Sequence, residues 1–158
     1  MTTADYENLG RELLKSYLDT LPGLEISMET TDKYDPVDYF AEFTGLRRCE
    51  FEIKTRASKY KDYPTHVLEK AKYQDMMKSK EDHSISFSYY VNFFVGQEIY
   101  MYLYNIDMVE KLGIPEVKVD YPWTKVYNTQ EKEKTIYNLP VSEAKIFKLT
   151  ETGWTIMN

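Results

Sequence analysis

One stretch of the sequence decides the fold, and it reads Glu50-Phe51-Glu52-Ile53-Lys54-Thr55-Arg56. Side chains of a β-strand point alternately to opposite faces of the sheet. Phe51 and Ile53, together with Cys49, are therefore expected to face a core, while Glu50, Glu52, Lys54 and Arg56 share the other face. Such a charged face is costly on an interior strand unless the charges are paired, solvated in a cleft or bound to a metal. The alternative is an edge strand whose charged face is solvated and forms cross-strand ion pairs.

A divalent cation explains this charged face. Mg²⁺ prefers hard oxygen ligands and is usually held by one or two carboxylates, water and substrate phosphate. Glu52 and the backbone carbonyl of Ile53 offer two such oxygens, and Asp38 on the neighbouring strand offers a second carboxylate. Lys54 lies about 7 Å further along the same face. A lysine there can position or deprotonate an attacking water and stabilise charge on a phosphate.

The rest of the chain predicts strands interleaved with helices, which favours a mixed α/β sandwich built around one sheet. We expect one domain over residues 1–158, with a core at about 3–105 and a C-terminal elaboration at 106–158. Turns are expected at 30–35 and at Gly45. The spacing of apolar residues and turn signals predicts helices at 3–21, 65–80, 105–112 and 141–147, and strands at 24–28, 37–43, 49–55, 85–94, 99–104, 134–139 and 154–157.

The segment Asp35-Pro36-Val37-Asp38, followed by Glu52-Ile53-Lys54, resembles the signature of the PD-(D/E)XK nuclease superfamily. The order of elements is similar to the restriction-endonuclease-like αβββαβ core of that superfamily, a central mixed sheet flanked by helices. The segment Glu69-Lys70-Ala71-Lys72-Tyr73 also looks like those of small phage-encoded members. The resemblance implies a nuclease that depends on Mg²⁺ or Mn²⁺ and cuts phosphodiester bonds, with DNA as the expected substrate.

The resemblance also implies roles for individual residues. Asp38 and Glu52 would hold the metal, and Lys54 would assist catalysis. Asp35 is the alternative to Asp38 because it adjoins the proline, but we prefer Asp38 because the predicted strand includes it. A glutamate of the first helix often joins such a site, and Glu12 is the candidate, with Glu7 second. Support is expected from the helix after the motif strand, with Lys72 as the first choice and Glu69 and Gln74 as alternatives.

The distribution of charge is uneven. The net charge of −6 argues against a strong non-specific grip on DNA. The middle of the chain is basic, however, and its expected contacts to nucleic acid are Arg56, Lys59, Lys61 and Lys70. Tyr60, Tyr63 and Tyr73 stand beside lysines, where they would either stack on bases or pack under lysine stems.

Other features of the sequence bound the class of protein. A single cysteine excludes an internal disulfide, and two histidines with one cysteine argue against a structural zinc site. There is no apolar run long enough to span a membrane, and the first residues lack the pattern of a signal peptide, so we expect a cytoplasmic protein, in the host cytoplasm if it is phage-encoded.

Two alternatives to an active nuclease stay open. One is a catalytically inactive module of the same fold that binds nucleic acid or protein. The other is a small interaction protein that uses its tyrosine-rich strands as a binding face. Nucleases of this kind often act as dimers, which leaves a homodimer open.

Overall fold

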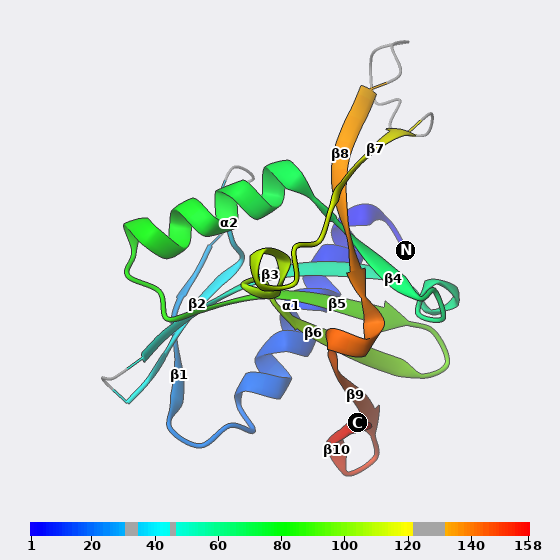
Figure 1. Cartoon of the computed structure of the whole chain (residues 1–158). Coiled ribbons are helices and arrows are strands. Elements are labelled where there is room, and N and C mark those ends of the chain that lie inside the picture. Colours follow the sequence, from blue (N-terminus) through cyan, green and yellow to red (C-terminus); the bar gives the residue numbers. More distant parts are fainter. Residues whose placement is uncertain (31–34, 45–46, 122–131) are drawn as a thin grey trace.

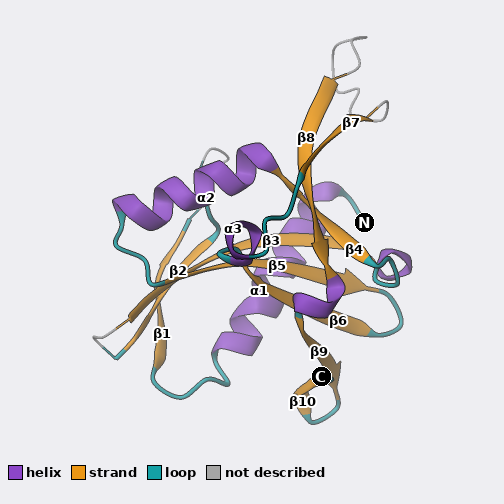
Figure 2. Cartoon of the chain, in the orientation of Figure 1, coloured by secondary structure: helices purple, strands orange, loops and turns teal. Residues whose placement is uncertain are grey.

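The computed structural model describes residues 1–30, 35–44, 47–121 and 132–158 of the chain. Within these residues a sheet of seven strands forms the centre of the molecule (Figures 1 and 2), in the order β1-β2-β3-β5-β6-β9-β10. The strand β3 pairs with β5 in parallel, and the other neighbours in this sheet are antiparallel. The strands are β1 Leu24–Glu29, β2 Tyr39–Phe43, β3 Arg47–Ala57, β5 Phe87–Val95, β6 Ile99–Asn105, β9 Lys145–Thr150 and β10 Gly153–Ile156.

The helices cover the two faces of this sheet. Helix α1 (Thr3–Leu18) packs on one face, and its start is fixed by a capping box between Thr2 and Asp5. Helix α2 (Lys70–Asp82) lies over the opposite face together with a second, three-stranded sheet in the order β4-β8-β7. The strands of that sheet are β4 Thr65–Glu69, β8 Lys132–Pro140 and β7 Glu116–Tyr121. Figure 1 shows β7 and β8 extending beyond the rest of the described chain.

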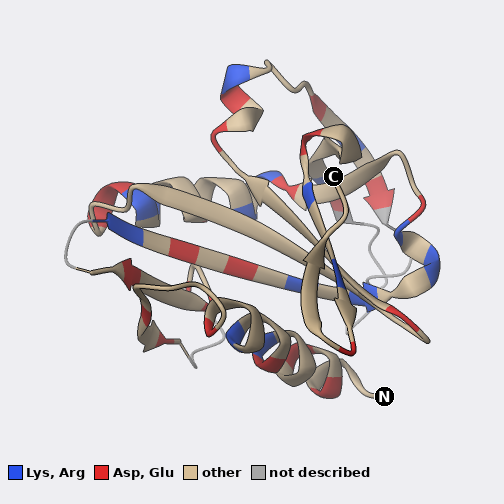
Figure 3. Cartoon of the chain, turned by 90° about the horizontal axis from the view of Figure 1, so that it is seen from below, with Lys and Arg blue, Asp and Glu red and all other residues tan. Residues whose placement is uncertain are grey.

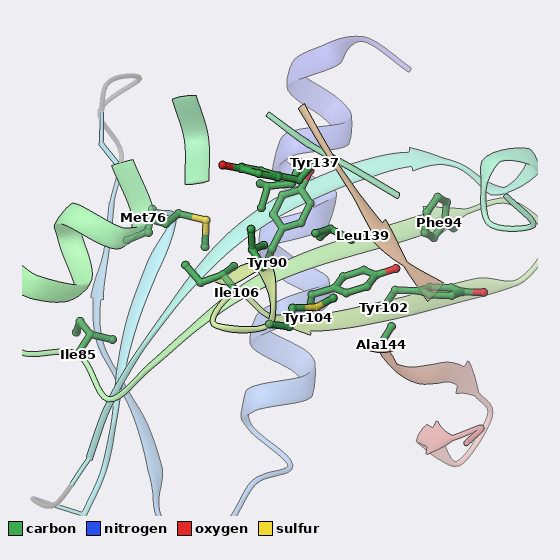
Figure 4. Packing of buried hydrophobic residues seen from close by; sticks show 14 of the residues in the cluster. Met76, Ile85, Tyr90, Phe94, Tyr102, Tyr104, Ile106, Tyr137, Leu139 and Ala144 are labelled. Atoms are coloured by element: carbon green, nitrogen blue, oxygen red, sulfur yellow. The ribbon is translucent and has the colours of Figure 1, made fainter. Parts of the chain in front are cut away.

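Two hydrophobic clusters fill the space on either side of the sheet. On the α1 side, Leu14 and Leu18 pack against Phe51, Val91 and Phe93. On the α2 side, aromatic residues of β5 and β6 meet Met76 of α2 and Leu139 of β8, as Figure 4 shows. The strands β3 and β5 each have a neighbouring strand on both sides, and both faces of the sheet are covered, so they are interior strands. No helix in the described part of the chain is long and apolar enough to cross a membrane.

The observed order contains the expected αβββαβ core, with one insertion. The expected helix at 65–80 is wrong at its start, because Thr65–Glu69 forms strand β4 and the helix begins at Lys70. Residues 65–69 pair with Pro140–Ile136 of β8, a partner about seventy residues away that no local pattern reveals.

The C-terminal part differs more from expectation. The expected helix at 141–147 is wrong beyond a single turn at Val141–Glu143, since Lys145–Thr150 forms β9 on the edge of β6. The strand at Glu116–Tyr121 was not expected. A short helix does occur at Met108–Lys111 (α3). Most of the expected turn at 30–35, and Gly45 itself, lie outside the described residues.

Candidate functional site

The charged face expected of β3 is present. Phe51 and Ile53 pack into the α1-side cluster. The alternate residues contact or face α2 and β4, and red and blue bands along one strand of the sheet in Figure 3 show such a mixture of charges. These alternate residues are Glu50, Glu52, Lys54 and Arg56.

Asp38 lies opposite Glu52. Strand β2 begins at Tyr39, so Asp38 precedes the strand instead of lying inside it as expected. Its backbone N–H still donates to the carbonyl of Phe51 over 2.9 Å, which extends the β2–β3 ladder by one residue. The Oδ2 atom of Asp38 accepts a hydrogen bond of 2.8 Å from the backbone N–H of Ile53. This bond fixes the carboxyl group beside β3 at the level of Glu52.

The two carboxyl groups share one partly buried space. The pKa of Glu52 is raised to about 8, first by burial and then by the charge of the neighbouring Asp38 carboxyl group and a hydrogen bond with it. The ammonium group of Lys72, on the first turn of α2, lies 3.1 Å from Oε1 of Glu52 and acts in the opposite direction. The Glu52 carboxyl group is therefore hard to ionise beside Asp38, and a cation bound between the two carboxyl groups would lower its pKa.

Arg11, which no sequence pattern indicated, also belongs to the site. Its guanidinium group lies 2.5 Å from Oδ1 of Asp38 and 3.6 Å from a carboxylate oxygen of Glu29. It also lies over the ring of Tyr39, 5.7 Å from the ring centre. Arg11 is thus held from three sides, and it supplies positive charge to Asp38 as Lys72 does to Glu52.

The phase of α1 explains why Arg11 and not Glu12 reaches the site. Arg11 precedes the buried Leu14 and Leu18 by three and seven residues, so it lies on the side of the helix that faces the sheet. Among the described residues, Glu7 lines the cavity in front of Asp38, whereas Glu12 is exposed and lines neither of the two cavities at the site. The structure therefore does not bring Glu12 to the other candidate ligands.

Two cavities adjoin each other at Glu52, Lys54 and Lys72. The carboxylate cavity, of about 610 Å³, is lined by Asp38, Glu52 and the first turns of α1, and also by Asp35. The aromatic cavity, of about 510 Å³, lies between β3, β4 and the turn at Ser58–Tyr60. Glu52, Lys54 and Lys72 line both cavities, and the side chain of Lys54 is exposed. Lys54 and Lys72 are therefore accessible from both cavities.

The remaining supporting candidates lie further out. Glu69 lines the aromatic cavity and pairs with Lys134 over 3.0 Å. Gln74 is exposed on α2. Of the three candidates on or next to α2, Lys72 is the one that contacts a candidate ligand.

The residues expected to contact nucleic acid divide into two groups. Arg56 lines the aromatic cavity, where it hydrogen-bonds to Asn92 and to the carbonyl of Val67, and Lys59 lies 5.0 Å from the ring centre of Tyr60. The other two are neutralised by acidic neighbours within 2.6 Å: Lys61 by Asp62 and Lys70 by Glu116. Of these four residues, the two without an acidic partner in the described structure, Arg56 and Lys59, are thus the ones near the aromatic cavity.

The donor set fits a divalent cation of the Mg²⁺ type. Asp38 and Glu52 provide hard oxygens on facing backbone positions, and each carboxylate oxygen has lone pairs beyond those used by its present partners. Within the described residues no group of three or more His, Cys, Asp or Glu side chains is arranged to hold a metal ion. A cation here would consequently rely on two carboxylates, a backbone carbonyl such as that of Ile53, water and substrate.

The likeness of this chain to known proteins is structural and distant. No family model matches the chain, and no curated protein matches it in sequence. Among solved structures, the chain is similar to Hjc of Archaeoglobus fulgidus, a Holliday junction resolvase from an archaeal hyperthermophile. The TM-score is 0.44 at 13% identity, and the alignment covers 87% of this chain and 96% of that one. The function is therefore inferred from the residues of the site.

Proposed function

We propose that this protein is a metal-dependent nuclease of the PD-(D/E)XK type that hydrolyses phosphodiester bonds, with DNA as its substrate. The proposal is supported above all by one arrangement: Asp38, just before β2, faces Glu52 on β3, and Lys54 follows Glu52 on the same face where two cavities open. A structural ion-pair network does not require an exposed lysine at the junction of two cavities.

Each residue has a distinct role in this proposal. Asp38, Glu52 and the Ile53 carbonyl would hold Mg²⁺ or Mn²⁺, which when bound polarises the phosphoryl group and makes a coordinated water more acidic. Lys54 donates a hydrogen bond that orients the attacking water, and its charge offsets the charge that develops on the phosphate. Arg11 and Lys72 position the two carboxylates through the ion pairs already described.

A cleavage assay tests the proposal. The full chain is incubated with single-stranded DNA, duplex DNA and RNA in Mg²⁺, in Mn²⁺ and in EDTA. We expect cutting only with metal, and a loss of at least about 100-fold in rate for both Asp38→Asn and Lys54→Ala. Lys118→Ala is the matched control, because Lys118 is a lysine on β7 whose side chain is 74% exposed and lines neither cavity. The proposal would be refuted if the wild type cut no substrate, or if the two site variants cut as fast as the wild type.

The second candidate function is a nuclease-fold module without activity that binds nucleic acid or protein. It is favoured by the net charge of −6 and by the cation already paired with each carboxylate, Arg11 with Asp38 and Lys72 with Glu52. Titration calorimetry separates the two functions, since the module would bind neither Mg²⁺ nor Mn²⁺ at millimolar concentration.

A further inference from the structure

The aromatic cavity is large enough for a ligand of its own. Its volume of about 510 Å³ lies within the usual range for small-molecule sites. It adjoins the candidate catalytic residues directly, because Glu52, Lys54 and Lys72 form part of its wall. An occupant would therefore be joined to, or lie next to, whatever group is placed at the carboxylates.

Two exposed tyrosines stand in the wall of this cavity. Tyr60 is 38% exposed and Tyr63 is 57% exposed, and their ring centres lie 6.0 Å apart. Within the described residues, the other large hydrophobic side chains that are exposed are all aliphatic: Met1, Met28, Leu112, Ile156 and Met157. Exposed aromatic rings therefore gather at one place, beside the candidate site. Aromatic side chains exposed in a basic groove are the usual platform on which unpaired bases stack.

Cations line the opening of the cavity, and Arg56 adds a further cation deeper in its wall, where it hydrogen-bonds to Asn92. Lys54 lines the cavity with an exposed side chain, and Lys59 extends over the Tyr60 ring. Deeper in, His66 is buried, and its Nδ1 lies 2.8 Å from the hydroxyl of Tyr104. Burial lowers the pKa of His66 to about 4, so this ring carries no charge at neutral pH. The cavity thus offers aromatic rings to a flat base and cations to an anionic group attached to that base.

We propose that the aromatic cavity binds an unpaired nucleobase next to the phosphate that is cut, so that the protein acts on single-stranded or locally unpaired nucleic acid. The position of that phosphate rests on the proposed nuclease function. The tilted pair of Tyr60 and Tyr63 offers an exposed ring face on which the base stacks, and the lysines at the opening contact its phosphate. A base within an intact duplex is stacked and paired, so it cannot enter without being extruded.

Binding without metal tests the cavity separately from cleavage. A fluorescent oligothymidylate of about 12 nucleotides and a blunt duplex of the same length are titrated with the full chain in EDTA, with anisotropy as the readout. For the double variant Tyr60→Ala/Tyr63→Ala we expect at least about 10-fold weaker binding of the single strand and little change for the duplex. Tyr60→Phe/Tyr63→Phe retains the rings and should stay within about 2-fold of the wild type. Leu112→Ala, which removes an exposed side chain outside both cavities, is the matched control.

A base analogue reports on entry into the cavity. An oligonucleotide with a single 2-aminopurine should lose fluorescence on binding to the wild type and to the phenylalanine variant, because the base stacks on a ring, but not on binding to the alanine variant. The variants change exposed side chains, and equal melting temperatures check that they fold.

The outcomes separate this inference from the proposed function. Quenching without any metal-dependent cutting would support the cavity and refute the nuclease. Equal binding of single strand by the alanine variant, an equal loss for single strand and duplex, or equally fast cutting of a fully paired duplex would overturn the cavity while leaving the nuclease intact.

Discussion

Two glutamates on the same face of β3 lie in opposite environments. Glu50 is fully buried, and both of its carboxyl oxygens accept hydrogen bonds of 2.6 Å from serine hydroxyls, Ser79 on α2 and Ser88 on β5. Glu52, two residues further along the strand, faces the carboxyl group of Asp38 and lines two cavities. We call these the closed end and the open end of β3.

The comparison shows that a buried acid is not by itself a functional site. Burial raises the pKa of both glutamates. At the closed end, neutral hydroxyls satisfy the carboxyl group and leave no room for a ligand. At the open end, the partners of the carboxyl groups are cations, and solvent reaches the space between them. The accessible cavity and the second carboxyl group distinguish the two ends, and both can be tested.

The largest expected difference is in cleavage rate. Glu52→Gln should lose at least about 1,000-fold, because it removes a carboxylate that would hold the metal, whereas Glu50→Gln should stay within about 5-fold of the wild type. Both changes keep the size of the side chain. Rates measured with Mg²⁺ on single-stranded DNA, with circular dichroism to check folding, decide the matter. Similar losses in two folded variants would contradict the division into a closed and an open end.

The closed end should dominate stability instead. Glu50→Ala should lower the free energy of unfolding by about 3 kcal/mol, because it leaves a cavity and deprives two buried serine hydroxyls of their acceptor. Urea unfolding measures the change, provided that the m-value stays constant. Glu50→Gln is the matched comparison, since it retains an acceptor and should cost about 1 kcal/mol or less. A loss of under 1 kcal/mol for Glu50→Ala would mean that the closed end does not hold β3 to α2 and β5.

The sequence predicts the charged face but not its division. Alternation along β3 requires only a period of two, so it is visible in seven residues. Whether Glu50 or Glu52 is enclosed depends on Ser79 and Ser88, which lie 29 and 38 residues beyond Glu50. Neither serine has a pattern that marks it as a partner of Glu50. The αβββαβ core followed from local periodicity, while the second sheet and the character of each carboxyl group depended on distant contacts.

Arg11 illustrates the same limit on α1. An acidic residue was expected to face the site from this helix, and the predicted apolar stripe runs through Tyr6, Leu9, Leu13, Tyr17 and Leu21, of which Leu13 and Tyr17 are buried as predicted. The buried positions include Gly10, Leu14 and Leu18, so the buried face is displaced around the helix toward Arg11. A small error in the phase of a helix is enough to exchange the residue that faces a site for its neighbour.

Acid should destabilise the protein through His66, a residue of β4 that lines the aromatic cavity. Its pKa of about 4 in the folded state is below the ordinary 6.5, so the unfolded chain binds more protons between these values. Stability from this residue is complete above about pH 6.5 and is lost as the pH falls toward 4, by about 2 kcal/mol at pH 5.

The raised pKa values of Glu50 and Glu52 act with the opposite sign, so the wild type alone does not isolate this effect. The free energy of unfolding of His66→Gln is therefore measured at about pH 7.5 and pH 5 and compared with that of the wild type. His83→Gln is the matched control, because the exposed His83 is the second of the two histidines. If His66→Gln and the wild type change equally with pH, His66 does not remain neutral in the folded protein.

The smallest expected effect tests the contact of helix α1 with β3 next to the open end. Helix α1 approaches β3 so closely at Gly10 that an added Cβ would lie 2.3 Å from Oγ1 of Thr55 and 2.9 Å from Cγ2 of Ile53. Gly10→Ala should therefore cost about 1 kcal/mol, since overpacking outweighs the better helix propensity of alanine. To make room for the added methyl group, α1 would have to shift away from β3. This shift would move Arg11 relative to Asp38, so the cleavage rate should fall several-fold while binding of single strands is retained. Glu12→Ala, on the exposed side of the helix, should change neither stability nor rate, and a lower rate for Glu12→Ala than for Gly10→Ala would return Glu12 to the site.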